Sequence, residues 1–352
     1  MVPESAKAPK PHTAGMACCL MRMSARVLPT ILFASLLAAC SGTGRNVAAA
    51  CRITRLARLP ITIVHNWPVV SVRINGHTAR MLVDTGSSAT IIDRRAMGRF
   101  GLRLYPQAIM ESGLGGATNV KFVNYNTFEV GSIHSAAWDF GGNKILATLN
   151  MPFPTLSKPL DGILGADFLS AFDIDLNIPH HRITVYRVRN CSGTFVPWKG
   201  PIDTISIRRT PGNSLLLPVR LDGHEIAAEF DTGSVMTVVK MSTARAIGIT
   251  SAMLKPVAGK YVTGVDGNKI PIKLHAFNTI QIGRSVFRNL PIVVMPAHLN
   301  GISAQTMQPP KMLLGAGYLA NHQVWLSYRT WRIFVRQVPV DKPVAIMGPL
   351  WK

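Results

Sequence analysis

The sequence predicts an all-β protein made of two related halves, and three observations lead to this prediction. The 352 residues include 29 glycines and 24 prolines, a content typical of chains with many turns between short strands. Few stretches show the 3.6-residue periodicity of a long amphipathic helix. Two blocks of the sequence also occur twice, which indicates an internal duplication.

The duplicated blocks open and close each half. The first contains Asp-Thr-Gly-Ser, at 84–87 and again at 231–234, and the spacing of 147 residues extends to a Gly-His pair that precedes both copies. The second block reads Leu-Gly-Ala after a hydrophobic residue, within 163–169 and again within 313–319. We therefore expect a repeated unit of about 130–150 residues, with its two copies related by a pseudo-twofold axis.

Each copy begins with a pattern typical of a β-hairpin. Hydrophobic and polar residues alternate over 69–74 before Asn75-Gly76, and 215–221 leads in the same way to Asp222-Gly223. Short helices are expected at Arg94–Phe100 and Ser242–Ile247. The predicted organisation is a signal peptide (1–39), a lipidated tether (40–58), an N-terminal lobe (59–190), a linker (191–202), a C-terminal lobe (203–338) and a tail (339–352).

The N-terminus has the features of an export signal. Arg22 and Arg26 precede an apolar run, 27–39, that is too short to span a bilayer. The run ends in Leu-Ala-Ala before Cys40, which resembles the lipobox of bacterial lipoproteins and implies cleavage before Cys40 and lipid on its sulfur. Because Ser41 rather than aspartate follows, we expect an exported protein anchored through Cys40 in the periplasm or at the outer membrane. A plain signal peptide with an incidental cysteine is the alternative.

The net charge of +21 predicts an anionic partner. Removal of 1–39, which holds four basic residues and one acidic residue, leaves +18. The chain has no basic run interleaved with aromatic residues and no known nucleic-acid-binding pattern, so an anionic membrane or envelope surface is expected rather than nucleic acid. Cys51 and Cys191 remain in the mature chain besides Cys40. Export permits a disulfide between them, and two unpaired thiols are the alternative.

The two Asp-Thr-Gly-Ser motifs carry the chemistry. Asp84 and Asp231 each follow an apolar strand, and a twofold relation would bring the carboxyl groups together. Two adjacent carboxyl groups cannot both ionise easily, so they hold one proton between them. The ionised group can then accept a proton from water while the protonated one donates to a carbonyl oxygen. Gly86 and Gly233 would allow the tight turn that this approach needs.

These motifs, with the hydrophobic-hydrophobic-Gly block after each, resemble those of the aspartic protease clan from about Ile61 to Val338. The resemblance implies two retropepsin-like lobes in one chain, with catalytic roles for Asp84 and Asp231. It implies that the threonines of the motifs, Thr85 and Thr232, cross to the opposite lobe. The serines at the fourth position, Ser87 and Ser234, would hydrogen-bond the carboxylates. Retroviral members carry alanine there, so we expect a more acidic working pH for this chain.

The family also places a glycine-rich hairpin, the flap, over the cleft. Gly113-Leu114-Gly115-Gly116 resembles the flap of retropepsins, and a second one is expected at Thr263-Gly264. Ordinary surface hairpin turns are the alternative at both places. Elsewhere, His180-His181 lack the spacing of metal ligands, and Asp167 faces Gly317 in the repeat, which argues against a symmetric catalytic task.

The expected activity is therefore that of an aspartic endopeptidase, a hydrolase that acts on extended peptides or proteins without a metal or a cofactor. Pairing of the two copies within one chain is favoured because the linker raises their effective concentration, so a monomer is expected. A homodimer, in which each lobe pairs with its counterpart in another molecule, stays open. The alternative function is an inactive retropepsin-like module that binds peptides or an anionic envelope polymer.

Overall fold

The computed structural model of the chain describes residues 50–113, 116–134, 144–210, 212–263, 269–295 and 311–339, and it describes side chains in these ranges except within 107–119 and at 262–263. Residues 48–352 belong to one compact unit. The predicted signal peptide, Cys40 and nearly all of the predicted tail lie outside the described residues. In the described part, no helix is long and apolar enough to cross a membrane.

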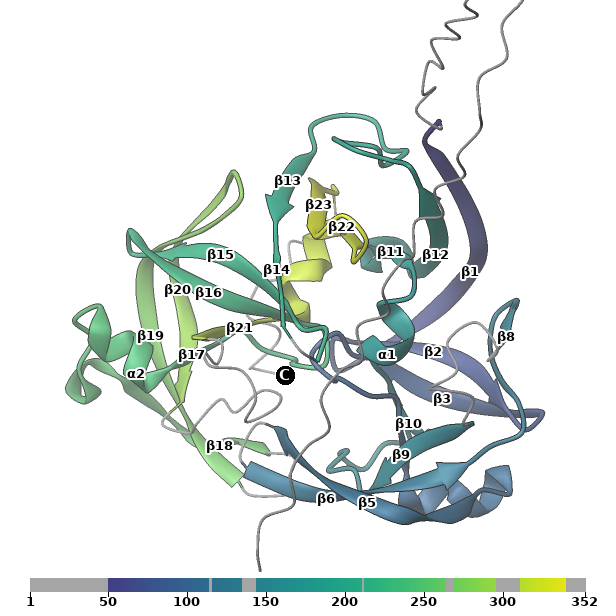
Figure 1. The fold of residues 1–352 in the computed structure, drawn as a ribbon. Helices are drawn as coiled ribbons and strands as arrows, with labels where there is room; N and C mark the ends of the chain where they lie inside the picture. The colour runs from purple at the N-terminus through teal and green to yellow at the C-terminus, as the bar shows by residue number, and fades with distance from the viewer. Residues whose placement is uncertain are drawn as a thin grey trace, which may run out of the picture. The chain divides into compact units, whose positions relative to one another are not determined.

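The prediction of an all-β protein is confirmed, and the strands follow the duplicated order expected from the sequence (Figure 1). The N-terminal half contains β1 (Arg52–Val64), β2 (Trp67–Ile74), β3 (His77–Val83), β4 (Ile91–Asp93), η1 (Arg94–Phe100), β5 (Arg103–Gly113), β6 (Gly116–Asn124), β7 (Phe128–Val130), β8 (Ile133–His134), β9 (Ile145–Leu149), β10 (Gly162–Leu164), α1 (Ala166–Leu169), β11 (Asp173–Asn177), η3 (Ile178–His180) and β12 (Arg182–Arg189). The C-terminal half contains β13 (Asp203–Ser206), β14 (Arg208–Arg209), β15 (Leu215–Leu221), β16 (His224–Asp231), β17 (Val238–Lys240), α2 (Met241–Ala246), η4 (Ser251–Met253), β18 (Lys255–Thr263), β19 (Lys269–Ile282), β20 (Ser285–Met295), β21 (Met312–Gly315), η5 (Ala316–Asn321), β22 (His322–Ser327) and β23 (Arg332–Gln337).

The two halves repeat the same strand connections. In the first, the hairpin β2–β3 is extended by β10, which runs parallel to β3 and antiparallel to β4. In the second, the hairpin β15–β16 is extended by β21, which runs parallel to β16 and antiparallel to β17. Both hairpins turn through two residues with positive φ, Asn75-Gly76 and Asp222-Gly223, as the sequence predicted. Each Asp-Thr-Gly-Ser motif therefore begins where a buried strand ends.

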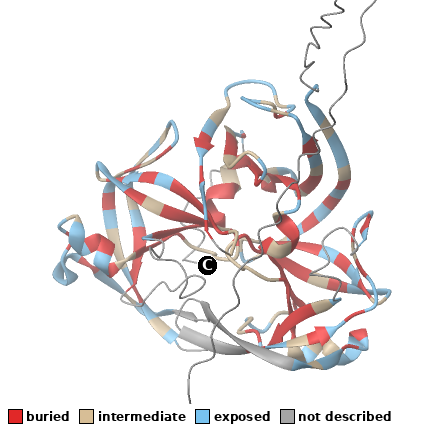
Figure 2. Ribbon diagram, in the orientation of Figure 1, coloured by how far each residue is buried: buried red, intermediate tan, exposed pale blue. Residues whose placement is uncertain are grey.

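A shared sheet joins the halves. Strands β1, β12 and β11 of the first half continue into β22, β23 and β13 of the second, because β11 pairs antiparallel with β22. Side chains reinforce this junction: Trp325 Nε1 donates to Asp173 Oδ2 over 2.8 Å, and Gln323 Nε2 donates to both oxygens of Asp175. Figure 2 shows buried residues in the strands of both halves.

Three apolar clusters bear on the site. The largest contains residues from both halves, among them Val83 and Phe230 next to the two motifs. A smaller one in the first half includes Leu82, Val69 and Ile163. Its counterpart in the second half includes Val238, Ile272 and Leu313. The smaller clusters occupy the opposite strand faces from the main core, because successive side chains on a strand alternate between faces.

Strand β1 and the cysteine before it add two features to the sequence expectations. Strand β1 begins at Arg52, inside the expected tether, because its backbone pairs with β12 over Arg52–Pro60. Cys51 and Cys191, for which two states were open, form a disulfide with a Cα–Cα distance of 4.4 Å. The bridge therefore ties the start of β1 to the residues after β12.

Candidate active site

The two predicted aspartates lie in turns of the same construction. The backbone N–H groups of Gly86 and Ser87 donate to Asp84 Oδ1 over 2.8 and 3.1 Å. In the second half, the N–H groups of Gly233 and Ser234 donate to Asp231 Oδ1 over 2.9 and 3.1 Å. Each carboxyl group is thus fixed by its own turn.

The turns bring the carboxyl groups of Asp84 and Asp231 into hydrogen-bond contact with each other. They approach so closely that a Cβ atom on Gly86 would lie 2.6 Å from Asp231 Cγ, and one on Gly233 would overlap the Asp84 carboxyl group. Glycine is therefore required at both positions by the packing of one turn on the other, a stronger demand than turn conformation alone.

Two buried threonines link the turns, as the family resemblance implied. The Thr85 hydroxyl donates to the Phe230 carbonyl over 2.6 Å and accepts from the Thr232 N–H over 3.1 Å. The Thr232 hydroxyl donates to the Val83 carbonyl over 2.6 Å and accepts from the Thr85 N–H over 3.0 Å. These four bonds run between the halves and fix the separation of the two carboxyl groups.

The serine hydroxyls behave differently from the expectation. Ser87 Oγ donates to the Ala89 carbonyl over 2.8 Å, and Ser234 Oγ donates to the Met236 carbonyl over 2.7 Å. A hydroxyl has one proton to donate, so neither donates to a carboxylate. The serines support the aspartates through their backbone N–H groups instead. This corrects the physical basis of the expected acidic working pH.

Burial dominates the electrostatics of the pair. It raises the pKa of Asp84, while the N–H groups of Gly86 and its neighbours oppose this by stabilising the ionised form. The pKa of Asp231 is raised well above its ordinary value, first by burial and then by the negative charges of Asp84 and Glu229. The pKa values of both carboxyl groups are therefore raised, and that of Asp231 is raised the more.

Two residues near the pair escaped the sequence reasoning. Trp67, at the start of β2, donates from Nε1 to the Gly233 carbonyl over 2.7 Å and so connects the first half to the second motif. Glu229 lies two residues before Asp231, is 2% exposed, and has a pKa raised to about 7, mainly by burial. The repeat could have revealed Glu229, because the matching position in the first copy is Leu82.

The expected flaps fall partly outside the described residues. Strands β5 and β6 form a hairpin in which Gly113 pairs with Gly116, and Leu114 and Gly115 lie outside the described residues. Strands β18 and β19 form the corresponding hairpin; Thr263 ends β18, and Gly264 lies outside the described residues. A role of these hairpins over a substrate stays a prediction.

The other residues considered have structural surroundings. Asp167 accepts from the N–H and the hydroxyl of Thr90 over 2.7 and 2.6 Å and from the Phe168 N–H over 2.7 Å, so it braces the loop after the first motif. His180 and His181 are exposed at the turn between β11 and β12. Among the described residues, no group of three or more His, Cys, Asp or Glu side chains could hold a metal ion.

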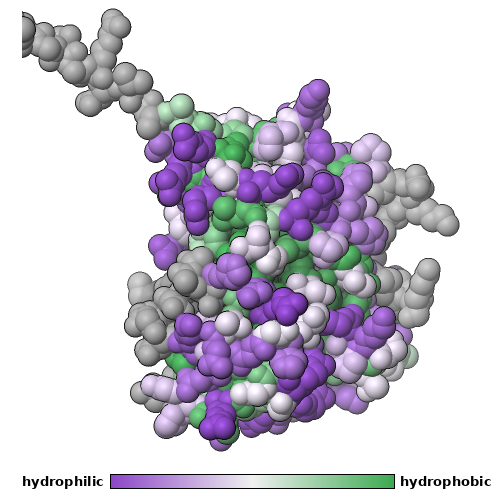
Figure 3. Space-filling view, turned by 90° about the vertical axis from the view of Figure 1, so that its right-hand side faces the viewer, coloured by the Kyte–Doolittle hydropathy of each residue, from purple (hydrophilic) through white to green (hydrophobic). Residues whose placement is uncertain are grey.

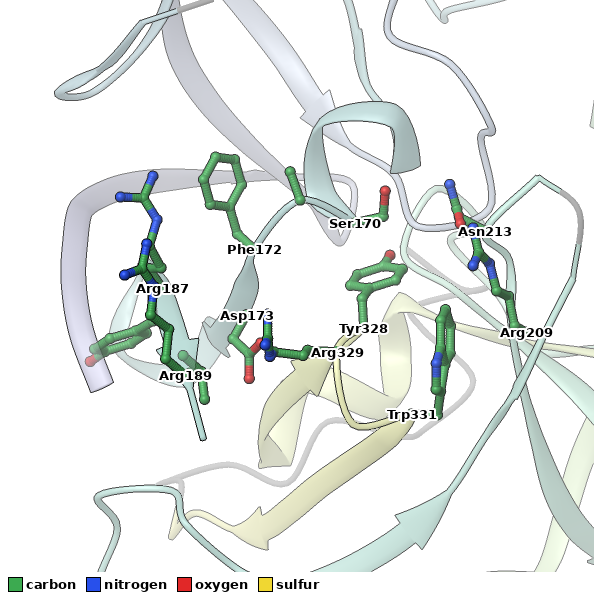
Figure 4. Close-up of a pocket in the computed structure, with 13 residues that line it drawn as sticks. Ser170, Phe172, Asp173, Arg187, Arg189, Arg209, Asn213, Tyr328, Arg329 and Trp331 are labelled. Atoms are coloured by element: carbon green, nitrogen blue, oxygen red, sulfur yellow. The ribbon is translucent and has the colours of Figure 1, made fainter. Parts of the chain in front are cut away.

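A pocket of about 460 Å³ lies among residues other than those of the two motifs (Figure 4). Arg187 and Arg189 of β12, Arg209 of β14 and Arg329 after β22 contribute to its lining, together with Asp173. Among the ion pairs of the described residues, none involves these four arginines. We name this feature the arginine pocket.

A sequence comparison decides the family. The profile of the family described as Aspartyl protease matches residues 70–168 and 217–318, one match in each half. The chain belongs to the aspartyl protease family. The predicted fold class, two retropepsin-like units in one chain, is thereby confirmed. Among solved structures, the aspartic proteinase from Irpex lacteus aligns with 84% of this chain and 100% of its own, at 13% identity and a TM-score of 0.48. No curated protein matches the chain.

Proposed function

We propose that this aspartyl protease family member is an active endopeptidase in which Asp84 and Asp231 activate a water molecule. The observation that carries the proposal is the close approach of the Asp84 and Asp231 carboxyl groups, both of which have raised pKa values. We propose that the two groups share one proton. Such a pair supplies a base and an acid at the same point in space, which is what the attack of water on a peptide carbonyl requires.

The unequal surroundings assign the roles. Asp84, with the less raised pKa, is the ionised base that takes a proton from water as the oxygen attacks the carbonyl carbon. Asp231 is the acid that donates its proton to the carbonyl oxygen, giving a neutral tetrahedral diol. Collapse of the diol breaks the carbon–nitrogen bond; the amine nitrogen receives a proton from the pair, and the diol returns one to it. The Gly86 and Gly233 N–H groups hold the carboxyl groups in place throughout.

The decisive experiment is cleavage of a peptide library by the purified protein, with and without pepstatin. Asp84→Asn and Asp231→Asn should each abolish inhibitor-sensitive cleavage, since neither can complete the base and acid pair. Glu225→Gln, on the exposed part of the same strand β16, is the matched control and should keep full activity. Absence of cleavage by the wild type, together with peptide binding that Asp84→Asn leaves unchanged, would instead favour the inactive binding module.

We propose the cell envelope as the site of action, with lipid on Cys40 as the anchor in the periplasm or at the outer membrane. The disulfide between Cys51 and Cys191 supports an oxidising compartment. Mass spectrometry of the protein from membranes should give a mature chain that begins at an acylated Cys40. A chain of that compartment that begins elsewhere and carries no lipid would contradict the anchor.

We propose further that the basic surface contacts an anionic membrane. Hydrophilic side chains cover much of the face shown in Figure 3, and the arginine pocket concentrates cations that lack ion-pair partners among the described residues. Replacing Arg187 and Arg329 by glutamine should weaken binding to phosphatidylglycerol vesicles about tenfold or more. Arg220→Gln with Arg245→Gln, which removes equal charge from exposed positions elsewhere, should weaken it less. If both double variants lost vesicle binding equally, net charge alone would explain the binding, and the arginine pocket would have no particular role.

The active species proposed is the monomer, because one chain supplies both aspartates and the four threonine hydrogen bonds between them. Sedimentation of the active protein should show a single chain. Activity that rises with the square of protein concentration would support the homodimer.

A further inference from the structure

The two halves differ at one position next to the carboxyl pair. Leu82 of β3 pairs with Val69 and Ile163 on the neighbouring strands and belongs to the apolar cluster of the first half. Glu229 of β16 has the matching partners, Leu216 and Leu313, in the second half. A leucine in one copy of the duplication is therefore replaced by a glutamate in the other, in the same strand surroundings.

Glu229 has little to compensate its burial. It is 2% exposed, the Ser214 hydroxyl hydrogen-bonds its carboxyl group, and Oε1 has no hydrogen-bond partner among the described residues. The positive charge of Lys240 acts on Glu229, but the two residues form no ion pair among those of the described residues. A buried carboxylate without a paired cation is costly, and an internal apolar side chain, as in the first half, would avoid that cost.

The position of Glu229 connects the carboxyl pair to the second hairpin. Glu229 and Asp231 are two residues apart on one strand, so their side chains lie on the same face, about 6.6 Å apart along the strand. Leu313, the neighbour of Glu229, packs in a cluster with Ile272 and, at its edge, Ile270, both from β19 of the hairpin β18–β19. Glu229 thus lies between Asp231 on its own strand and an apolar cluster that includes residues near the turn of that hairpin.

We propose that Glu229 is a specificity-determining residue that receives a lysine or arginine side chain of the peptide substrate in the subsite next to Asp231. A basic side chain of the substrate would supply the hydrogen-bond donor that Oε1 lacks and a cation within ion-pair distance. The matching subsite of the first half is apolar at Leu82. This inference rests on the proposed protease function and deepens it: the peptide bond cleaved should have a basic residue on one side and an apolar residue on the other.

The charged groups around Glu229 determine the pH dependence of this preference. The charge of Asp84 raises the pKa of the Glu229 carboxyl group and that of Lys240 lowers it, while the charge of Glu229 in turn raises the pKa of Asp231. Because burial raises the pKa of Glu229 to about 7, the free protein holds it neutral in acid. A bound cation stabilises the ionised form, so the preference for a basic residue should increase as the pH rises toward 7.

The test uses peptide pairs that differ only in charge: arginine against citrulline, and lysine against norleucine, at each residue flanking the scissile bond. Wild type should show kcat/KM about tenfold or more higher for the charged peptide at one flanking position. Glu229→Gln should lose this preference, so that its kcat/KM values for the charged and the neutral peptide of each pair become equal. Glu229→Leu, which copies the first half, should prefer norleucine, and Glu225→Gln should behave as wild type.

Equal kcat/KM for charged and neutral peptides in the wild type would overturn the inference, and so would a preference that Glu229→Gln retains. An equal loss of cleavage of all peptides in Glu229→Gln would also overturn it, since that result assigns Glu229 to the carboxyl pair rather than to substrate selection. Binding of the same peptides to Asp84→Asn protein separates this inference from the proposed function, because a charge preference in binding does not require cleavage.

Discussion

At the scale of single residues, unequal neighbours make two similar aspartates different. Each carboxyl group accepts hydrogen bonds from two backbone N–H groups of its own turn. Asp231 also shares a strand face with Glu229, whose counterpart beside Asp84 is the uncharged Leu82. After burial and the charge of Asp84, the negative charge of Glu229 contributes to the larger rise in the pKa of Asp231, which is why Asp231 is proposed as the acid.

Glu229 should also make the stability of the protein depend on pH. Its pKa rises from an ordinary value of 4.5 to about 7 on folding. Between pH 4.5 and pH 7 the folded chain therefore keeps a proton on Glu229 that the unfolded chain has lost. The contribution of Glu229 to the stability of the folded state is complete below pH 4.5 and is lost as the pH rises through 7. Glu229→Gln should unfold with a free energy on the order of 3 kcal/mol higher than wild type at pH 8, and with an equal one near pH 4. Urea titrations at both values check this; a difference that does not change with pH would contradict it.

The serines yield a prediction opposite to the sequence expectation. Since the hydroxyls of Ser87 and Ser234 donate to backbone carbonyls, Ser87→Ala and Ser234→Ala should leave the acidic limb of the pH–rate profile where it is. Each change should lower the free energy of unfolding by about 1 kcal/mol, the usual contribution of one hydrogen bond. A shifted acidic limb in either variant would restore the direct contact with the carboxylate.

The sequence predicted which side chains meet at the pair but not all the directions of their hydrogen bonds. Asp84, Asp231 and the two threonines could be assigned because the motif and its repetition determine where they lie. The acceptor of the Ser87 hydroxyl could not be assigned, because the hydroxyl can reach either the carboxylate before it or the carbonyl two residues after it. The geometry of the turn decides between them. Trp67 was missed because no local pattern relates it to Gly233, 166 residues away.

At the scale of elements, the junction between β11 and β22 depends on buried polar contacts. Trp325 Nε1 donates to Asp173, a buried residue, while its ring stacks on Tyr186 at a centroid distance of 4.5 Å. Trp325→Phe should keep the stacking and leave the Asp173 carboxyl group without this donor, at a cost of roughly 1–3 kcal/mol in unfolding free energy. Chemical denaturation measures it. An unchanged midpoint would show that the hydrogen bond contributes no net stability.

Elements that depend on neighbouring residues could be predicted from the sequence better than elements that depend on pairing with a distant strand. The hairpin turns at Asn75-Gly76 and Asp222-Gly223 followed from residues that accept positive φ. The helix expected at Arg94–Phe100 forms as a 3-10 helix, capped by Asp93. Strand β1 was assigned to the tether over 52–58 because its pairing partner, β12, lies more than a hundred residues further along the chain.

At the scale of the whole molecule, the disulfide closes a segment of 140 residues that contains all of the N-terminal half. Closing so long a loop removes much of the freedom of the unfolded chain. Cys51→Ser with Cys191→Ser should therefore lower the free energy of unfolding by about 2–5 kcal/mol. Thermal unfolding with and without reductant offers a second measurement, in which the double variant should no longer respond to the reductant. A wild type insensitive to reductant would contradict the prediction.

The place of that bridge has a consequence if the proposed lipid on Cys40 anchors the protein. Cys51 comes immediately before β1, so tension applied through the preceding chain reaches the sulfur–sulfur bond before it reaches the first hydrogen bond between β1 and β12. Strand β1 would therefore not separate from β12 one residue at a time from its N-terminal end. The load would pass through a covalent bond to Cys191, so the pairing of β1 with β12 would not be the first contact to bear it.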